Sequence, residues 1–313
     1  MKELRKDYLL DRYVIIAPDR KNRPENFRQP EENKQVDKCP FCPGNESMAP
    51  PEIGRIEDEN GWYIRWFENK FAFVSQEGDP TLRTDNTYFT WASGYGRHEV
   101  IVETPKHNDE MHMLSEKHIA EILKVYRDRI GLLSRLDGIK YVNVFRNQGI
   151  KGGTSLVHSH SQVVAHTLVP KVVREKLEAT SKLTYCPYCD IIAIEKGSFR
   201  RCYENESFVA FAPYASRFPF EIWVFPKRHV SRMDELKDNE FADWAQILKK
   251  ILIKLKEMNA SFNYFIHYAP KGEDLHLHME VVPRITLWAG FEYSSDVCIN
   301  IVPPEDAAEF YRS

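Results

Sequence analysis

The chain has 313 residues, enough to bury a substantial core in one large domain or in two of ordinary size without disulfides. Its apolar fraction of 42% and charged fraction of 28% are those of a folded globular protein and exclude a disordered chain. The net charge of −3 provides no field that would attract a polyanion, so nucleic acid is excluded as an expected partner.

The N-terminus and the cysteines indicate the compartment. Residues 1–6 are charged and lack the apolar core of a signal peptide, and no run of about 18 apolar residues occurs in the chain. We therefore expect a cytoplasmic protein without a membrane partner. Six cysteines are present, and four of them form two Cys-Pro-aromatic-Cys units, at 39–42 and 186–189. In a reducing compartment this spacing favours a metal over a disulfide.

The predicted elements, taken in chain order, are short strands and two long helices. Segments rich in Val, Ile, Phe and Tyr predict the strands, and apolar residues at helical spacing predict the helices. Hairpin-type connections with helices on one side favour an α+β fold built on an antiparallel sheet. The predicted strands are 99–103, 141–145, 161–165, 220–225, 264–267 and 277–282, and the predicted helices are 115–133 and 239–258.

Four motifs occur twice in the same order, which indicates a duplicated unit with a longer first copy. Each copy has a Cys-x-x-Cys unit, a Phe-containing segment, a segment ending in histidine and a His-x-His unit. We expect two units, 1–170 and 171–313, with the boundary in the charged segment 170–184. The four motifs are 39–42, 67–73, 99–107 and 158–164 in the first copy, and 186–189, 204–211, 221–229 and 276–282 in the second.

The most informative residues are His158, His160 and Gln162. Alternate residues of a strand share a face, so these three side chains project together while the intervening serines point the other way. The preceding segment 147–155 is rich in glycine, which lets backbone N–H groups approach an anion, and hydroxyls at Thr154 and Ser155 add hydrogen bonds. This pattern indicates a phosphate site, although a His-x-His unit alone is equally compatible with a metal pair or exposed strand residues.

The run Asn147-Gln148-Gly149 followed by His158-Ser159-His160-Ser161-Gln162 resembles the active-site signature of galactose-1-phosphate uridylyltransferases, a branch of the histidine-triad superfamily. The similarity covers nearly the whole chain and implies tandem histidine-triad-like units. It implies that His160 attacks the α-phosphorus of a nucleoside diphosphate sugar and that Gln162 contacts the phosphate. A neutral imidazole is a good nucleophile near pH 7, and the amide of Gln162 supplies no acid or base, which favours transferase over hydrolase.

The resemblance also implies substrate contacts, although a solvated basic loop or turn residues would be the default interpretation of several of them. Arg side chains suit a diphosphate because their fork matches its oxygens. A carboxylate near the end of the chain suits sugar hydroxyls. The implied residues are Arg20, Arg23, Asn69, Lys70, Asn147, Gly153, Thr154, Ser155, Phe291 and Glu292.

The resemblance completes a first metal site by adding His107 and His158 to Cys39 and Cys42. A Cys₂His₂ set fills a tetrahedral zinc ion and leaves no open position, so the zinc would be structural and would hold His160 in position through its neighbour. The alternative is a buried thiol pair with unrelated histidines. The second copy repeats the set, so a second zinc is expected at Cys186, Cys189, His229 and His276.

His278 occupies the place of the nucleophile in the second copy, but Glu280 stands where Gln162 would be and no glycine-rich loop precedes it. We therefore interpret the second copy as catalytically silent. The leading functional hypothesis is transfer of UMP from UDP-glucose to galactose 1-phosphate through a uridylyl-His160 intermediate. An adenylyltransferase of the ADP-glucose phosphorylase type is the alternative enzyme, and a zinc-stabilised nucleotide-binding module without turnover is the alternative of another class. The resemblance implies a homodimer acting on a UDP-sugar and a hexose 1-phosphate.

Overall fold

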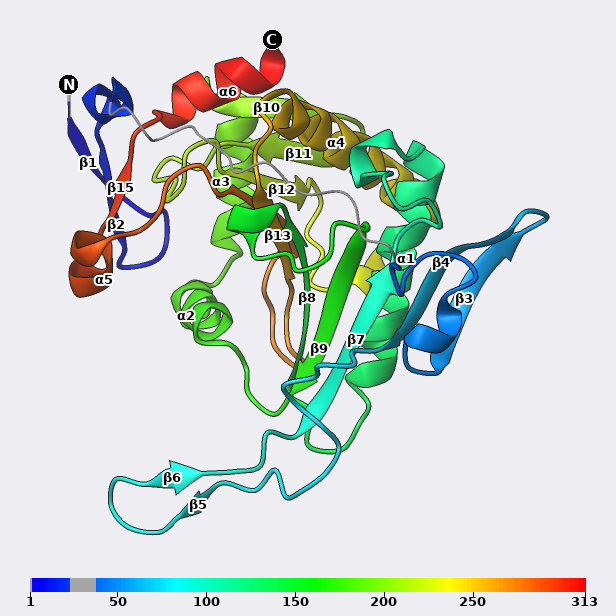
Figure 1. Ribbon diagram of the computed structural model, residues 1–313. Coiled ribbons are helices and arrows are strands. Elements are labelled where there is room, and N and C mark those ends of the chain that lie inside the picture. The colour runs from blue at the N-terminus through cyan, green and yellow to red at the C-terminus, as the bar shows by residue number, and fades with distance from the viewer. Residues whose placement is uncertain (1, 23–37) are drawn as a thin grey trace.

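A computed structural model describes residues 2–22 and 38–313, and in it one ten-stranded sheet crosses both copies of the repeat (Figure 1). Every neighbouring pair in this sheet is antiparallel. Across the sheet the strands are β10 (Arg201–Glu204), β11 (Phe208–Phe211), β12 (Ile222–Pro226), β14 (His278–Pro283), β13 (Phe262–His267), β8 (Tyr141–Gln148), β9 (His160–His166), β7 (Gly96–Val102), β4 (Gly61–Glu68) and β3 (Glu52–Asp58).

The two halves of the sheet have the same internal order. Counting from either outer edge, the strands run β3-β4-β7-β9-β8 in the first copy and β10-β11-β12-β14-β13 in the second. The halves join where β8 pairs with β13, with Asn147 opposite Asn263 and Phe145 opposite Phe265. The predicted α+β fold with a large antiparallel sheet is confirmed, and the mirrored order agrees with the duplication of its motifs.

The two long predicted helices are α1 (Glu116–Leu133) and α4 (Asp238–Glu257), which contact each other on one face of the sheet. At the start of α1, the side chain of Ser115 accepts a hydrogen bond from the backbone N–H of His118. Apolar residues at helical spacing give each helix a buried stripe. Ile122 of α1 and Trp244 of α4 lie in the main core at 0% exposure, together with Val144 and Val281 from the strands.

The remaining elements are shorter. The helix α2 (Lys171–Thr180) lies in the charged segment that was expected between the copies, and its Lys176 contacts His267 of β13 and His278 of β14. The hairpin β5 (Arg83–Thr84) and β6 (Thr90–Trp91) projects from the body (Figure 1). The others are α3 (Pro187–Lys196), α5 (Gly290–Ser295), α6 (Pro304–Arg312) and the 3₁₀ turns η1 (Pro18–Asn22), η2 (Glu46–Met48), η3 (Met111–Met113), η4 (Ile150–Gly152) and η5 (Met233–Glu235).

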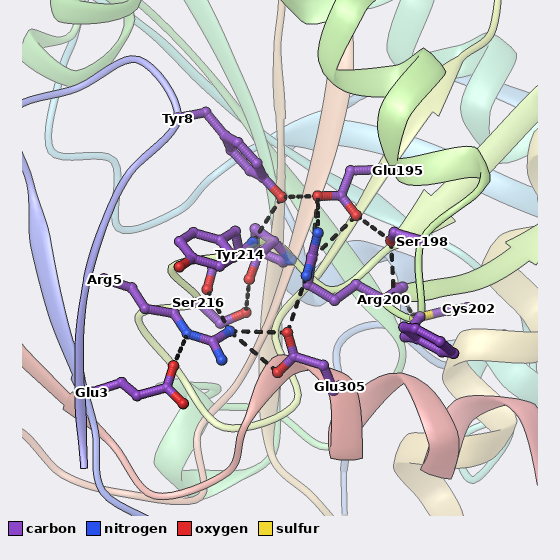
Figure 2. A network of polar contacts seen from close by, with 12 residues as sticks. Glu3, Arg5, Tyr8, Glu195, Ser198, Arg200, Cys202, Tyr214, Ser216 and Glu305 are labelled. Atoms are coloured by element: carbon purple, nitrogen blue, oxygen red, sulfur yellow. Dashed lines mark hydrogen bonds and ion pairs between the residues drawn. The ribbon is translucent and has the colours of Figure 1, made fainter. Parts of the chain in front are cut away.

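A three-stranded sheet joins the two ends of the described chain. Its strands β1 (Glu3–Lys6) and β2 (Tyr13–Ile16) pair antiparallel, and β15 (Cys298–Asn300) pairs parallel to β2. Figure 2 shows the polar network that fastens this sheet to the second copy. Glu305 of α6 accepts from Arg5 over 3.0 Å and from Arg200 over 3.0 Å, while Glu195 of α3 accepts from Tyr8 over 2.7 Å.

Among the helices of the described residues, none combines the length and the apolarity that a membrane crossing needs.

Candidate active site and metal sites

The strand β9 places the predicted catalytic residues on one face. It lies between β7 and β8, with His160 opposite Val102 and Gln162 opposite Val100 of β7. His160 and Gln162 therefore point to the same side, and the serines between and before them point to the other. The alternation that the sequence predicted is present in the structure.

The ring of His160 is held in one tautomer. Its Nδ1 lies 2.7 Å from the carbonyl oxygen of His158, and because a carbonyl only accepts, Nδ1 must carry the proton. Nε2 is then left with its lone pair. The side chain is 7% exposed, and this burial lowers the pKa of His160 below its ordinary value. A neutral, oriented imidazole with its Nε2 lone pair available is the form that a nucleophile requires.

A buried polar network holds β9 from behind. Ser159 donates to Glu103 over 2.6 Å, Ser161 donates to the same carboxylate, and Arg146 of β8 donates to it over 3.0 Å. Burial alone would raise the pKa of Glu103, but the charge of Arg146 and the serine hydroxyls lower it below its ordinary value. The carboxylate thus stays ionised at the interior face and anchors the two serines that flank His160.

Gln162 is held by a residue that the sequence did not single out. Nε2 of His98 lies 2.8 Å from Oε1 of Gln162 and 3.0 Å from Nδ2 of Asn69, so His98 joins the predicted nucleoside contact to the predicted phosphate contact. Burial lowers the pKa of His98. His98 stands two residues before Val100 in β7, so the side chains of these two residues lie on the same face of the strand. This alternation was the signal in the sequence from which His98 could have been found. Lys70, the neighbour of Asn69, is exposed.

The glycine-rich loop between β8 and β9 requires its glycines. Gly149 and Gly153 have φ values of +77° and +84°, and a Cβ at Gly152 would lie 2.8 Å from the carbonyl oxygen of Phe262. Asn263 of the second copy donates to the side chain of Asn147 over 2.8 Å and to the carbonyl of Gly152 over 2.7 Å. The second copy therefore shapes the loop, a contact that the sequence analysis missed.

The hydroxyls predicted to line this loop are arranged unequally. Thr154 donates to the carbonyl of Leu156 over 3.0 Å, so its hydrogen is used inside the loop and its oxygen remains an acceptor only. Ser155, the next residue, is exposed.

The four residues of the first predicted metal site come together. The two sulfurs of Cys39 and Cys42 and the Nδ1 atoms of His107 and His158 lie within 4.8 Å of one another. The sulfur-to-nitrogen distances are 3.5 to 3.6 Å. Ideal tetrahedral zinc bonds would separate sulfur from nitrogen by about 3.6 Å, so the donor set fits this ion. Nε2 of His158 donates to the carbonyl of Thr104 over 2.7 Å, which leaves Nδ1 as the ligand atom.

This cluster is physically connected to His160. The ring of Phe41, inside the Cys39–Cys42 turn, lies 5.9 Å from the ring of His158 and 5.3 Å from that of His160. Burial lowers the pKa of His158 to about 4, so the imidazole is neutral at pH 7 as a metal ligand must be.

The four residues of the second predicted site also meet. The sulfurs of Cys186 and Cys189 and the Nδ1 atoms of His229 and His276 form a group of the same size, with sulfur-to-nitrogen distances of 3.6 to 3.8 Å. Nε2 of His276 donates to the carbonyl of Pro226 over 2.9 Å, in the manner of His158. The donor set again suits a tetrahedral ion held by two thiolates and two imidazoles. Groups able to hold a metal are thus present in both copies.

The other predicted substrate residues lie elsewhere in the chain. Arg20 is in η1, directly after β2, and Phe291 and Glu292 are in α5, which leads into β15. All three therefore flank the three-stranded sheet, away from β9 (Figure 1). Arg23 lies outside the described residues. Within one chain, Arg20, Phe291 and Glu292 therefore lie away from His160.

Two family models match the chain. The model for galactose-1-phosphate uridyl transferase, N-terminal domain, matches residues 1–170, and the model for the C-terminal domain matches residues 194–286.

Individual relatives resemble nearly the whole chain. ADP-glucose phosphorylase of Arabidopsis thaliana is 34% identical, over 99% of this chain and 92% of the relative. Galactose-1-phosphate uridylyltransferase of Thermotoga maritima is 30% identical, over 100% of this chain and 98% of the relative. The crystal structure of the Arabidopsis thaliana ADP-glucose phosphorylase with bound ADP-glucose superimposes with a TM-score of 0.85 at 33% identity, over 100% of this chain and 99% of that one.

Proposed function

Since the chain belongs to the galactose-1-phosphate uridylyltransferase family of nucleotidyltransferases, we propose that it moves a nucleoside monophosphate from a nucleotide sugar to a phosphate acceptor through His160. The observation that carries this proposal is the tautomer of His160. Its Nδ1 proton is committed to the carbonyl of His158, so the lone pair of Nε2 is available beside Gln162 and the glycine-rich loop.

In the first step, Nε2 of His160 attacks the α-phosphorus of the nucleotide sugar. A phosphorus–nitrogen bond forms, and the bond from the α-phosphorus to the bridging oxygen breaks. The hexose 1-phosphate leaves with that electron pair. The side chain of Gln162, whose Oε1 lies 2.8 Å from Nε2 of His98, contacts the phosphoryl oxygens and acts as neither an acid nor a base. The backbone N–H groups of the glycine-rich loop supply further donors to the same oxygens.

In the second step, an oxygen of the acceptor phosphate attacks the phosphorus, the phosphorus–nitrogen bond breaks, and neutral His160 is restored. Two displacements at one histidine require ping-pong kinetics. A zinc ion at Cys39, Cys42, His107 and His158 would supply structural support only, because four protein ligands complete its coordination. The chain's own residues fix the imidazole of His160. The carbonyl of His158 orients its Nδ1–H, and Phe41 contacts its ring.

Two substrate pairs fit this mechanism. The sequence favoured UMP transfer from UDP-glucose to galactose 1-phosphate, that is, UDP-glucose:hexose-1-phosphate uridylyl transfer, and the 30% identity to the Thermotoga maritima enzyme supports it. AMP transfer from ADP-glucose to phosphate is supported by the 34% identity to ADP-glucose phosphorylase and by the TM-score of 0.85. Because the sequence identity to the phosphorylase is the greater, we place ADP-glucose with phosphate first and the uridylyl reaction second.

We further propose the assembly around the site. Arg20, Phe291 and Glu292 flank the three-stranded sheet rather than β9, so they can serve the reaction at His160 only from a second copy of the chain. This supports the homodimer that the sequence implied. The unit boundary at 170/171, two zinc ions per chain and a cytoplasmic location remain parts of the proposal.

The half-reactions test the proposal and separate the two substrate pairs. The chain is incubated with ADP-glucose or with UDP-glucose, its intact mass is measured under mildly alkaline conditions, and the adduct is then challenged with phosphate or galactose 1-phosphate. We expect an AMP adduct with release of glucose 1-phosphate, discharged by phosphate to ADP. A UMP adduct discharged by galactose 1-phosphate would make the second pair correct. Binding of both nucleotide sugars without any adduct would contradict the covalent mechanism and favour a binding module.

A further inference from the structure

A buried cluster in the second copy repeats part of the active-site geometry. Nδ1 of His278 donates to the carbonyl of His276 over 2.8 Å, as Nδ1 of His160 does to His158. Nε2 of His278 therefore carries a lone pair too. Its neighbours are His267 of β13 and Glu280 of β14, and all three residues are at most 3% exposed.

Three acceptor atoms converge in this cluster. Nδ1 of His267 lies 3.3 Å and Nε2 of His278 lies 3.5 Å from Oε1 of Glu280. Burial lowers the pKa of His267 to about 4, so this ring is neutral at pH 7. The Nδ1–H of His278 is committed to the carbonyl of His276, which leaves Nε2 of His278 as an acceptor. Two imidazole nitrogens and a carboxylate oxygen pointing at one buried position form a set that binds a cation.

The cation at this position belongs to the protein. Nζ of Lys176, on α2, lies 2.7 Å from Nε2 of His278 and 2.9 Å from Nδ1 of His267, and it forms an ion pair with Oε1 of Glu280. An ammonium group has three hydrogens, and here each has one acceptor. Lys176 as a whole is 2% exposed, and its Nζ lies 5.3 Å from the ring centre of Trp223.

We infer that Lys176 is a built-in cation that fills a latent metal site in the second copy and keeps both a metal ion and a phosphoryl group away from His278. Each of the three acceptor atoms accepts a hydrogen bond from the ammonium group, and for the two imidazole nitrogens this uses the only lone pair. The other oxygen of Glu280 lies 3.4 Å from Arg217, which adds a second positive charge on that side. A divalent cation would have to displace the ammonium from a buried position where all three acceptors already contact it. The cluster of His267, His278 and Glu280 is thus metal-free while Lys176 is present.

Cobalt binding tests this inference with the full chain. Lys176→Ala removes the ammonium and leaves the three acceptors, so we expect it to bind one Co²⁺ per chain more than the unsubstituted protein. The extra ion should lack the intense thiolate charge-transfer absorption of cobalt bound to cysteine, because its ligands are nitrogen and oxygen. In the matched control Lys176→Ala/Glu280→Gln the carboxylate is neutral, and the extra ion should be lost while the thiolate absorption is unchanged.

The outcomes divide clearly. A Lys176→Ala chain that unfolds cooperatively and binds no additional cobalt contradicts the inference. If Lys176→Ala does not fold, the unsubstituted protein decides: crystals grown with cobalt should show no anomalous peak between His267, His278 and Glu280. A peak at that position would overturn the inference. Neither result depends on nucleotidyl transfer, so failure of the proposed reaction is separately visible.

Discussion

In β9 and in β14, the second histidine of a His-x-His unit donates its Nδ1–H to the carbonyl two residues earlier, over 2.7 Å from His160 and 2.8 Å from His278. Backbone geometry and tautomer are therefore alike in the two copies. Beyond the ring they differ, because Nε2 of His278 accepts from Lys176, whereas in residues 2–22 and 38–313 no side-chain donor reaches Nε2 of His160. We therefore propose that the group facing Nε2, rather than the strand itself, makes the first copy reactive and the second copy silent.

The rear faces of the two strands differ as well. The residues that alternate with the histidines are Ser159, directly before β9, and Ser161, within it, and both donate to the ionised Glu103. In the second copy they are Leu277, directly before β14, and Met279, within it, and both lie in the apolar core at 0% exposure. The first copy thus holds its strand by directed hydrogen bonds, and the second holds it by packing. Hydrogen bonds fix the orientation of a side chain more narrowly than apolar packing does.

Replacing the second histidine of each His-x-His unit is expected to have the largest effect and to show the largest difference between the two copies. His160→Gly should abolish the nucleotidyl adduct, because no imidazole nitrogen remains to bond the phosphorus, and nucleotidyl transfer should fall by roughly 10⁴- to 10⁶-fold, as loss of a nucleophile does. His278→Asn should leave the stoichiometry at one adduct per chain. Quenched-flow labelling followed by intact mass measures both, and loss of the adduct in His278→Asn chains that remain folded would break the comparison.

Breaking the rear network of the first copy should cost stability. Arg146→Met leaves Glu103 as an unpaired buried charge, so the free energy of unfolding should fall by about 3–5 kcal/mol, as when one partner of a buried ion pair is removed. The double variant Arg146→Met/Glu103→Gln removes the charge and should recover part of the loss. Urea unfolding measures each value, and equal losses in the single and double variants would contradict the role of the buried charge.

Disrupting the two Cys-x-x-Cys units should give unequal effects on activity. Cys39→Ser perturbs the turn whose Phe41 contacts His160, and we expect labelling to slow about 10- to 100-fold, the size of effect seen when residues that orient a metal site are changed. Cys186→Ser perturbs the second copy and should lower the melting temperature with less effect on labelling. Metal content by mass spectrometry accompanies both measurements. Equal slowing by the two variants would show that the first cluster has no special connection to His160.

The pH dependence of labelling should be the smallest effect. Burial lowers the pKa of His160, so its neutral form persists below the ordinary histidine pKa of about 6.5. The rate of adduct formation should therefore stay nearly constant from pH 8 to 6.5 and fall only at lower pH, once the lowered pKa is crossed. Single-turnover rates measure this profile. A fall centred at or above pH 6.5 would mean that the ring is not desolvated as the structure describes.

Much of the fold and part of the site followed from the sequence because they depend on local periodicity. Strand alternation predicted that His160 and Gln162 share a face, and the repeated motifs predicted two similar halves of a sheet. The charged segment 170–184 contains α2, but no pattern in it indicates that Lys176 reaches His278, because that contact joins a helix to a strand about 100 residues away in the chain. The parallel pairing of β15 with β2 and the contact of His98 with Gln162 are long-range for the same reason.

The most direct test of the account is phosphorus NMR of the nucleotidylated chain labelled with ¹⁵N-histidine. The structure places the proton of His160 on Nδ1 and the lone pair on Nε2. We predict one phosphoramidate signal per chain, coupled to Nε2 of His160 and lost in His160→Gly. Coupling to Nδ1, or a phosphoramidate on His278, would contradict the account.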